Sequence, residues 1–434
     1  MDQALLPQWV LTDPEIYALE HEKIFPRTWQ FLAHESELKN PGDFVTRWMV
    51  DDPVLLVKGE DGVIRAFLNS CTHRGTYLCA ADSGNRRTFT CPYHGWTFNW
   101  HGDLVGVALG NTLYGAELDR SAMGLRPLPR LESVYGMIFG NLDPHAMSLR
   151  EYLGDMLWYF EILLKRTAEG MEVIGVPHRW VVEANWKLTY ENFTGDPYHV
   201  QSTHRSTVEL GITPHRAGED GRMGHQIVLT HGHGVNITQL TYVPPHPYQH
   251  TPESLWPLFE QSLSPVQARL LKHASVLVGG VFPTLSFVSP QHGTEGEVFN
   301  YLNFRVWRPL GPYKVEIWSW CLIDKEAPSD YKQQAYRAYV GSFGPSGTLE
   351  QDDTEMWSRV VQASRGHMVR NKNLAYNNFA NYLMGYGRVE PDPTFPGPGQ
   401  AYPGFVDAVS RSIHQYWFEL LTADNAAEVM SHEL

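Results

Sequence analysis

Cys71-Thr72-His73-Arg74-Gly75 and Cys91-Pro92-Tyr93-His94-Gly95-Trp96 are the two stretches that decide how the rest of the chain is interpreted. Each stretch pairs one cysteine with one histidine. Each pair also falls where strand-forming segments are interrupted by turn residues, so we expect both pairs at the tips of β-hairpins. Two thiolates and two imidazoles brought together in this way predict a metal site.

Two kinds of metal site use this set of donors. One is a structural zinc ion, and the other is a Rieske [2Fe–2S] cluster, in which two cysteines bind one iron and two histidines bind the other. The Cys-x-His spacing is tighter than the pairs of a zinc finger, and each pair mixes the two ligand types. Gly75 and Gly95 would let backbone N–H groups approach the sulfurs. The pattern therefore favours the cluster over zinc or coincidence, with the candidate ligands Cys71, His73, Cys91 and His94.

The composition of the chain excludes several classes of protein. With 434 residues, of which 43% are hydrophobic, the chain can bury one large core or two ordinary ones. Its net charge of −14 argues against a nucleic-acid partner. It has no apolar run near the roughly 18 residues of a membrane helix, and Met1 to Val10 does not resemble a secretory signal. We expect a cytoplasmic protein without disulfides, in which Cys79 is a buried thiol.

The pattern of apolar and turn residues predicts an α+β protein. Thr12-Asp13-Pro14 predicts the start of a helix that runs to Ile24. Further helices are predicted over 149–165 and 405–421. The predicted strands cover 54–57, 63–68, 88–100, 104–107, 281–288, 299–307 and 315–323. We expect an N-terminal helical part over 1–37, a small all-β domain over 38–147 and a larger mixed domain over 148–434.

A second candidate metal site lies in the larger domain, where Glu191-Asn192-Phe193-Thr194-Gly195-Asp196-Pro197-Tyr198-His199 leads to His204. The two histidines can face one point from a helix that ends or distorts between them. Asp196 can share a helical face with His199 and accept the N–H of a ligating imidazole. A further acid would complete a 2-His-1-carboxylate iron site, which leaves open positions for O₂ and substrate.

The best source of that acid is Glu350-Gln351-Asp352-Asp353, but spacing alone does not choose among its members. The two histidines alone could also be ordinary helix residues. The upstream cluster motif favours a metal site, because a chain that brings electrons to a cluster needs a site that uses them.

Together these motifs resemble the large (α) subunits of bacterial Rieske non-haem iron aromatic-ring-hydroxylating dioxygenases, of the naphthalene, biphenyl and p-cumate type. The resemblance runs over most of the chain. It is carried by Trp29 to Ser36, Pro41 to Phe44, Cys71 to Gly75, Cys91 to Trp96, Asn185 to Lys187, Glu191 to His204 and Phe343 to Asp353.

The resemblance implies a small all-β Rieske domain inserted in a catalytic domain built from an antiparallel sheet and helices. It implies that His199, His204 and Asp353 bind the mononuclear Fe(II), and that Asn192 is a further catalytic residue. It also implies that Asp196 bridges His199 to His94 of a neighbouring subunit. By position in the family pattern, the expected pocket residues are Phe193, Val200, Val276, Val278, Val288, Trp307, Phe343, Leu349 and Trp357.

The implied reaction adds both atoms of O₂ to an arene to give a cis-dihydrodiol, with electrons from NADH delivered through a reductase and a ferredoxin. The implied assembly is α₃β₃ with a small β subunit. The alternatives are a Rieske monooxygenase or demethylase, a Rieske electron-transfer protein and a zinc-stabilised binding module. The motifs do not identify the substrate, although Arg305 in the pocket would favour a carboxylated ring.

Overall fold

The computed structural model of the protein describes residues 4–115, 117–212, 222–242, 244, 246–294, 297–370 and 379–423. The chain forms two compact units, one of Met1–Ile24 with Arg150–Leu434 and one of Phe25–Leu149. The smaller unit is thus inserted in the sequence of the larger one. It begins earlier than the expected boundary at residue 38, because β2 (Gln30–His34) pairs with β11 (Met137–Asn141) inside it.

The smaller unit consists of three antiparallel sheets with the strand orders β5-β4-β3-β6, β7-β8-β9 and β10-β11-β2. The other strands and the one short helix described in this unit are β3 (Asp43–Met49), β4 (Asp52–Lys58), β5 (Ile64–Leu68), β6 (Ser83–Asn85), β7 (Phe89–Thr90), β8 (Thr97–Phe98), β9 (Leu104–Gly106), β10 (Arg130–Val134) and α2 (Gly110–Leu113). The hairpin predicted over 54–68 is confirmed by the pairing of β4 with β5. The strand predicted over 88–100 is wrong as one element, because the Cys91–Trp96 loop separates β7 from β8.

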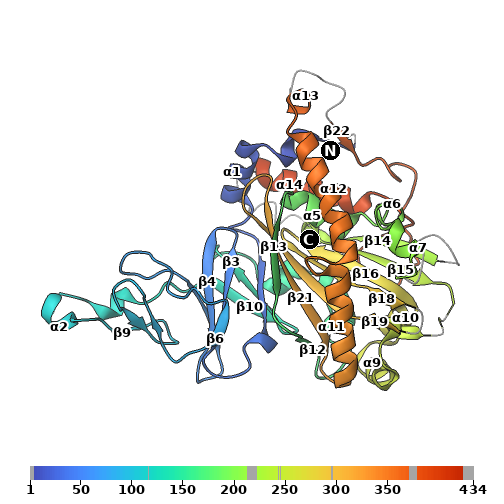
Figure 1. The fold of residues 1–434 in the computed structure, drawn as a ribbon. Coiled ribbons are helices and arrows are strands. Elements are labelled where there is room, and N and C mark those ends of the chain that lie inside the picture. Colours follow the sequence, from blue (N-terminus) through green and yellow to red (C-terminus); the bar gives the residue numbers. More distant parts are fainter. Residues whose placement is uncertain are drawn as a thin grey trace. The chain divides into compact units, whose positions relative to one another are not determined.

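The larger unit is built on a nine-stranded antiparallel sheet (Figure 1). In spatial order, its main path is β12 (Met171–Val173), β21 (Val315–Asp324), β20 (Leu302–Pro309), β17 (Leu285–Ser289), β16 (Ala274–Val281), β15 (Gly234–Leu240), β14 (Arg222–Val228) and β23 (Gln400–Pro403). β13 (His178–Val182) also pairs with β21. Two small ladders complete the strands, β1 (Leu5–Pro7) with β22 (Phe379–Asn381) and β18 (Gln291–Thr294) with β19 (Glu297–Asn300).

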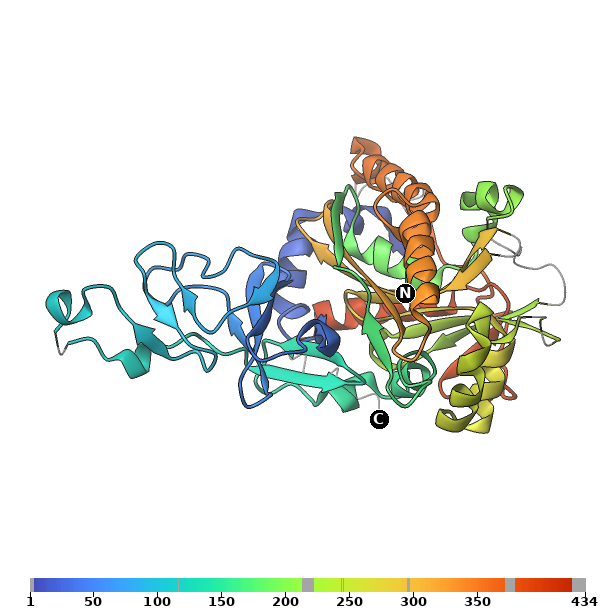
Figure 2. The same ribbon diagram turned by 60° about the horizontal axis from the view of Figure 1, so that its bottom comes forward.

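Helices cover this sheet and carry most of the candidate site. The principal ones are α1 (Pro14–Lys23), α4 (Met156–Leu164), α5 (Trp186–Gly195), α6 (Val200–Thr203), α9 (Trp256–Ser262), α10 (Pro265–His273), α11 (Ser329–Phe343), α12 (Thr348–Ser364) and α14 (Ala408–Thr422). Short helical turns are α3 (Leu149–Leu153), α7 (Arg205–Glu209), α8 (Pro247–His250) and α13 (His367–Arg370). α5 lies against β15, β16, β17 and β20, while α14 packs on α5 and β14. α11 and α12 follow one another beside the sheet (Figure 1, Figure 2).

Several predicted elements match the described structure and others are divided. The strand over 315–323 and the closing helix over 405–421 correspond to β21 and α14. The helix over 149–165 breaks between α3 and α4, because Gly154 adopts a positive φ of 47° there. The strand over 281–288 is a hairpin between β16 and β17. Within the described residues, every helix is too short or too polar to span a bilayer.

Candidate functional site

The two Cys–His loops of the smaller unit have the same backbone conformation. The Cys71 N–H donates to the Thr76 carbonyl and the Gly75 N–H returns to the Cys71 carbonyl, at 2.9 and 2.8 Å. The second loop repeats both bonds, from Cys91 to Trp96 and from Gly95 to Cys91, at 2.7 and 3.0 Å. Both glycines adopt a positive φ, which turns each loop tightly. Both Cys–His pairs thus lie in tight turns of the same kind, as the sequence predicted for two hairpin tips.

The four side chains of these loops suit a cluster ligated by two sulfurs and two nitrogens. Cys71 and Cys91 are buried free thiols that lie next to each other. Burial, partly offset by the backbone N–H of His73, raises the pKa of Cys71. The rings of His73 and His94 lie 4.6 Å apart. Their Nδ1 atoms are buried without a hydrogen-bond partner among the described residues, as expected of atoms whose partner is a metal.

Cys79 lies outside this set. It is buried in the core of the smaller unit, and its backbone N–H and carbonyl bond the side chain of Asn69 at 3.0 and 2.7 Å. The expectation of a buried thiol is confirmed.

The imidazole of His73, in the first Cys–His loop, stacks on the indole of Trp96 at 4.7 Å. The second loop thus holds the ring of a candidate ligand in the first.

In the larger unit, helix α5 is anchored firmly at its N-terminus. The Asn185 side chain caps it by accepting the Lys187 N–H at 3.0 Å. Glu20 then accepts hydrogen bonds from Trp186, Lys187 and Trp417, at 2.8, 2.6 and 2.8 Å. This buried carboxylate ties α1, α5 and α14 together, so the other end of α5 delivers its side chains to the site from a fixed support.

Helix α5 ends at Gly195, directly before the candidate residues. Asp196 precedes a proline, which disfavours the helical conformation, and its ψ is 76°. The expectation that Asp196 and His199 share one helical face is therefore wrong. The Asp196 carboxylate instead accepts the N–H groups of Tyr198 and His199 at 3.1 and 3.2 Å, and its Oδ2 lies 3.6 Å from His199 Nδ1.

His199, His204 and Asp353 form the group of possible metal ligands in the larger unit. Asp353 Oδ1 lies 3.4 Å from His199 Nε2 and 3.2 Å from His204 Nε2. His204 and Asp353 are buried, and Asp353 reaches the site from α12. The two imidazoles and the carboxylate that the sequence suggested as ligands thus point to one place. Among the described residues, Asp353 Oδ1 has no other hydrogen-bond partner.

The electrostatics of this group favour a cation. Burial works against protonation of His199, but the carboxylates of Asp196 and Asp353 outweigh it and raise its pKa to about 10. Burial alone would raise the pKa of Asp353, yet the two imidazoles hold it well below its usual value. A buried carboxylate that stays charged needs positive charge beside it, which a metal ion held by the three side chains can supply.

The Nδ1 atoms on the far side of the two rings are also held. His199 Nδ1 contacts the Asp196 backbone carbonyl and, at 3.3 Å, the Asn192 amide. His204 Nδ1 lies 3.3 Å from Asp352 Oδ2. Carbonyl and carboxylate partners at Nδ1 orient Nε2 toward a metal. The contact of Asp352 with His204 was not anticipated, because the sequence pointed to the Glu350–Asp353 segment without showing which acid faces which ring.

A cavity of about 170 Å³ opens beside the three candidate ligands. One wall comes from strands, where the alternation of side chains places Val276 with Val278 and Asn236 with Thr238 on one face. The residues expected in the pocket that do line it are Phe193, Val200, Val276, Val278, Val288, Phe343 and Leu349, and Asn192, expected as a catalytic residue, lines it as well. The polar lining residues away from the ligands include Asn236, Thr238, Ser275 and Gln291.

Two expected pocket residues lie behind the wall instead. Trp307 and Trp357 are buried and pack on the ring of Phe193 at 5.1 and 6.4 Å. They support the lining residue and do not line the cavity, which corrects the prediction. Arg305 is not a lining residue either, because its guanidinium pairs with the buried carboxylate of Glu350. The lining that the structure describes contains no lysine or arginine to meet a substrate carboxylate.

Comparison with known proteins gives a family for each of the two parts of the chain. Residues 28–112 match the Rieske [2Fe-2S] domain, and residues 171–415 match the ring hydroxylating alpha subunit (catalytic domain). The chain is 32% identical to the N,N-dimethyl phenylurea N-demethylase subunit alpha of Sphingobium sp., over 99% of this chain and 94% of the relative. It is 36% identical to the large oxygenase component of the naphthalene 1,2-dioxygenase system of Pseudomonas aeruginosa, over 89% and 84%.

Among solved structures, naphthalene 1,2-dioxygenase from Rhodococcus sp. bound to indole superposes with a TM-score of 0.91. That protein is 40% identical, and the match covers 97% of this chain and 95% of that one. The expected resemblance and the α+β fold are both confirmed over the full length. The chain therefore belongs to the ring-hydroxylating oxygenase α subunits, with a Rieske [2Fe–2S] domain and a ring-hydroxylating catalytic domain.

Proposed function

We propose that this subunit adds both atoms of O₂ to a small, uncharged arene to give a cis-dihydrodiol. The overall reaction consumes the arene, O₂, two electrons and two protons. The observation that carries the proposal is the position of His199, His204 and Asp353 in the wall of a mostly apolar cavity. A 2-His-1-carboxylate site leaves positions open for O₂ beside a bound ring.

The residues of this chain take three roles in the proposal. His199, His204 and Asp353 would hold a mononuclear Fe(II), which supplies the activation of O₂ when it is bound. Cys71, His73, Cys91 and His94 would hold the cluster, which stores and passes single electrons. The apolar wall binds the ring and excludes water from the reaction.

Asp196 is proposed to connect the two sites across neighbouring subunits. Its Oδ1 is used by backbone N–H groups, while Oδ2 lies near His199 Nδ1 and the side chain is 37% exposed. An exposed carboxylate in this position can accept a hydrogen bond from a histidine of another chain, proposed to be His94. Residues close to both partners are exposed as well: Tyr198, two residues after Asp196, is 55% exposed, and Tyr93, next to His94, is 61% exposed.

The proposed partners follow from this arrangement and from the relatives, which are components of multicomponent systems. We propose an α₃β₃ ring with a small β subunit, so that each cluster meets the iron of the next subunit. A ferredoxin and an NADH-dependent reductase would deliver the electrons.

The cavity limits the substrate. A volume of about 170 Å³ is small beside the roughly 300–1,000 Å³ of drug-sized pockets, and a cavity of about 150 Å³ can hold benzene. The described lining supplies no cationic partner for a carboxylate. We therefore favour an uncharged ring over the carboxylated ring that Arg305 would have suggested, with any polar substituent directed to Asn236, Thr238 or Gln291.

Product analysis with ¹⁸O₂ tests the proposal. The purified subunits, supplied with ferredoxin, reductase and NADH, should convert a small arene to a dihydrodiol that carries two labelled oxygens. Metal analysis should give three irons and two acid-labile sulfides per chain. A protein with zinc and no sulfide would contradict the cluster assignment.

A second candidate is oxidative N-demethylation, which the full-length similarity to a demethylase subunit favours. The same two metal sites would serve, and the polar lining residues would meet an amide or urea group. N-demethylation would send one oxygen of O₂ to a hydroxymethyl group that leaves as formaldehyde and the other to water. Formaldehyde release from an N-methyl aryl substrate, with no labelled oxygen in the aryl product, therefore distinguishes this reaction from dihydroxylation.

A further inference from the structure

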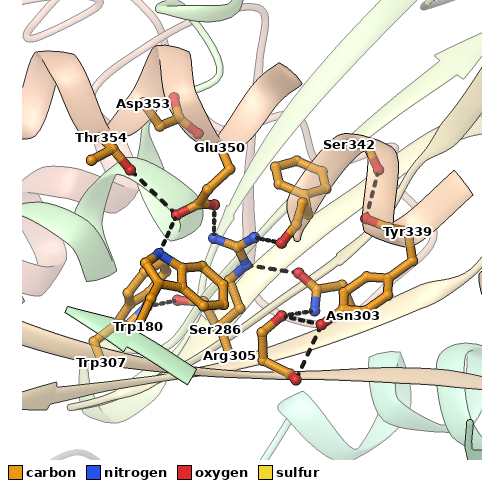
Figure 3. Close-up of polar contacts among 12 residues, drawn as sticks. Trp180, Ser286, Asn303, Arg305, Trp307, Tyr339, Ser342, Glu350, Asp353 and Thr354 are labelled. Carbon is orange, nitrogen blue, oxygen red and sulfur yellow. Dashed lines mark hydrogen bonds and ion pairs between the residues drawn. The ribbon is translucent and has the colours of Figure 1, made fainter. Parts of the chain in front are cut away.

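A buried ion pair lies behind the cavity wall, between strand β20 and helix α12 (Figure 3). Arg305 and Glu350 are 0% and 1% exposed, and the guanidinium binds the carboxylate through Nη1. Neither residue lines the cavity. The pair therefore does not contact a bound substrate and contacts instead the residues that support the site.

The carboxylate end of the pair acts on the helix that carries Asp353. Glu350 is one turn before Asp353 on α12, so both side chains lie on the buried face of that helix. Its second oxygen accepts the indole N–H of Trp180, from β13, at 3.2 Å. Two fixed partners on one carboxylate thus restrict rotation and sliding of α12 beside the sheet.

The guanidinium end acts on the cavity wall. Arg305 donates to the Phe343 carbonyl at 2.8 Å, and to the Asn303 side chain at 2.7 Å. The guanidinium carbon of Arg305, Cζ, lies 4.7 Å from the ring centre of Phe193 and 4.8 Å from that of Phe343. Both rings line the cavity. One cation therefore contacts a wall residue of α5, the end of α11 and, through Glu350, helix α12.

Stability alone does not explain such a pair. Removing two charges from water is costly, and a well-packed apolar pair of similar volume is often as stable or more so. A directional pair does differ from an apolar pair in one respect, because its fork of donors sets the distances between the groups that it joins.

We propose that Arg305 and Glu350 are positioning residues, which together set the orientation of the Asp353 carboxylate and the spacing of the Phe193 and Phe343 rings. The inference rests on the proposed function, in which Asp353 binds Fe(II). It adds that metal affinity and the position of the substrate ring are coupled through one guanidinium.

The test uses single variants, an apolar double variant and a matched control pair. The singles are Arg305→Lys and Glu350→Gln, and the double variant is Arg305→Met with Glu350→Leu. The control pair is Arg166 with Asp324, which is also buried, bonds at 3.0 and 2.7 Å and packs over Phe259, and none of these three residues lines the cavity. Arg166→Lys and Asp324→Asn are the control variants.

Three readouts are measured on the assembled oxygenase: the melting temperature, the affinity of the non-cluster site for Fe(II), and the ratio of oxidation products from a substituted arene. We expect Arg305→Lys and Glu350→Gln to weaken Fe(II) binding by about tenfold, at the low end of the range for residues that orient ligands. We also expect them to change the product ratio. The control variants should lower the melting temperature to a similar extent and leave iron affinity and product ratio as in the wild type.

The double variant separates positioning from support of the fold. We expect it to recover the melting temperature while iron affinity and product ratio stay altered. Wild-type values of both in the double variant, or equal effects in the Arg166 and Arg305 series, would overturn the inference. A wild-type protein that binds no iron beyond the cluster would instead contradict the proposed function.

Discussion

Asp352 and Asp353 are adjacent residues with different positions at the site. Asp353 Oδ1 faces the Nε2 atoms of both histidines, whereas Asp352 Oδ2 faces only Nδ1 of His204. We expect Asp353→Ala to lose the mononuclear iron and all product formation, because a ligand is removed. Asp352→Ala should keep the iron and weaken its binding by about 10–100-fold, as for other partners of ligating histidines.

Iron titration of both variants, with the visible spectrum of the cluster as a control for folding, measures the difference. Each variant should keep the cluster spectrum, since the cluster ligands belong to the other compact unit. If Asp352→Ala loses the iron and Asp353→Ala keeps it, the carboxylate ligand is Asp352 and not Asp353.

The residues of the candidate iron site show how far sequence reasoning reaches at this scale. His199 and His204 could be proposed from a short spacing, because local geometry limits where neighbouring side chains point. Asp353 came only from the family resemblance, since its approach depends on how α12 packs. The contact between Asp352 and His204, and the pairing of Arg305 with Glu350, depend on packing between distant segments and left no pattern in the sequence.

At the scale of elements, Gly195 is where α5 packs closely on α14. A Cβ added there would lie 2.5 Å from Ser410 Oγ and 2.9 Å from the Ser410 nitrogen. We expect Gly195→Ala to separate the two helices and to reduce the free energy of unfolding by about 1–3 kcal/mol, as overpacking does. Because Asp196 follows directly, iron affinity should fall as well. Denaturant unfolding and iron titration measure the two effects.

Gly341→Ala is a matched control in another helix. A Cβ at Gly341, an exposed position in α11, meets nothing within 4 Å. Replacement of a helical glycine by alanine should stabilise the protein by roughly 0.5–1 kcal/mol without a change in iron affinity. If Gly195→Ala behaves like this control, the close approach of α5 and α14 does not support the site.

Elements were predicted best where one local pattern sufficed. β4, β5 and β21 follow from strand-forming residues between turns, and α14 from its apolar periodicity. The interrupted elements were predicted as continuous, because apolar content does not reveal where a strand stops, as at the turn between β16 and β17. The Cys91–Trp96 loop was expected from its ligand motif and not from the strand pattern, which ran through it. The full strand order of the large sheet could not be predicted. Neighbouring strands such as β16 and β17 or β20 and β21 pair across short turns, but β12, β13 and β23 pair with strands far away in the chain.

At the scale of the whole molecule, the residues of the two proposed metal sites belong to separate compact units. Changes at one site should therefore leave the other site loaded. We expect His73→Ala to abolish or shift the visible spectrum of the cluster while mononuclear iron still binds. His199→Ala should do the reverse. Absorption spectra and metal-to-protein ratios of the two variants measure this, and a spectrum lost from both would indicate that the two sites fold only together.

The last prediction concerns electron transfer between subunits. Asp196→Asn keeps the size of the side chain and the oxygen that can accept the Tyr198 and His199 N–H groups. It removes the negative charge and places an amide N–H₂, which donates and cannot accept an imidazole N–H, where the second carboxylate oxygen lies. We expect the variant to bind both metals and to have a cluster that ferredoxin still reduces, but to form almost no product.

The size of the loss distinguishes two roles of Asp196. If the carboxylate only orients His199, product formation should fall by about 10–100-fold, with weaker iron binding to match. If it also joins the two centres, product formation should fall much further while iron affinity changes little, because the ligand set is intact and the path for the electron is broken. Single-turnover oxidation of the pre-reduced cluster would then be slow even with iron and substrate bound. A variant that oxidises its cluster at the wild-type rate would reduce Asp196 to the residue that shapes the turn after α5.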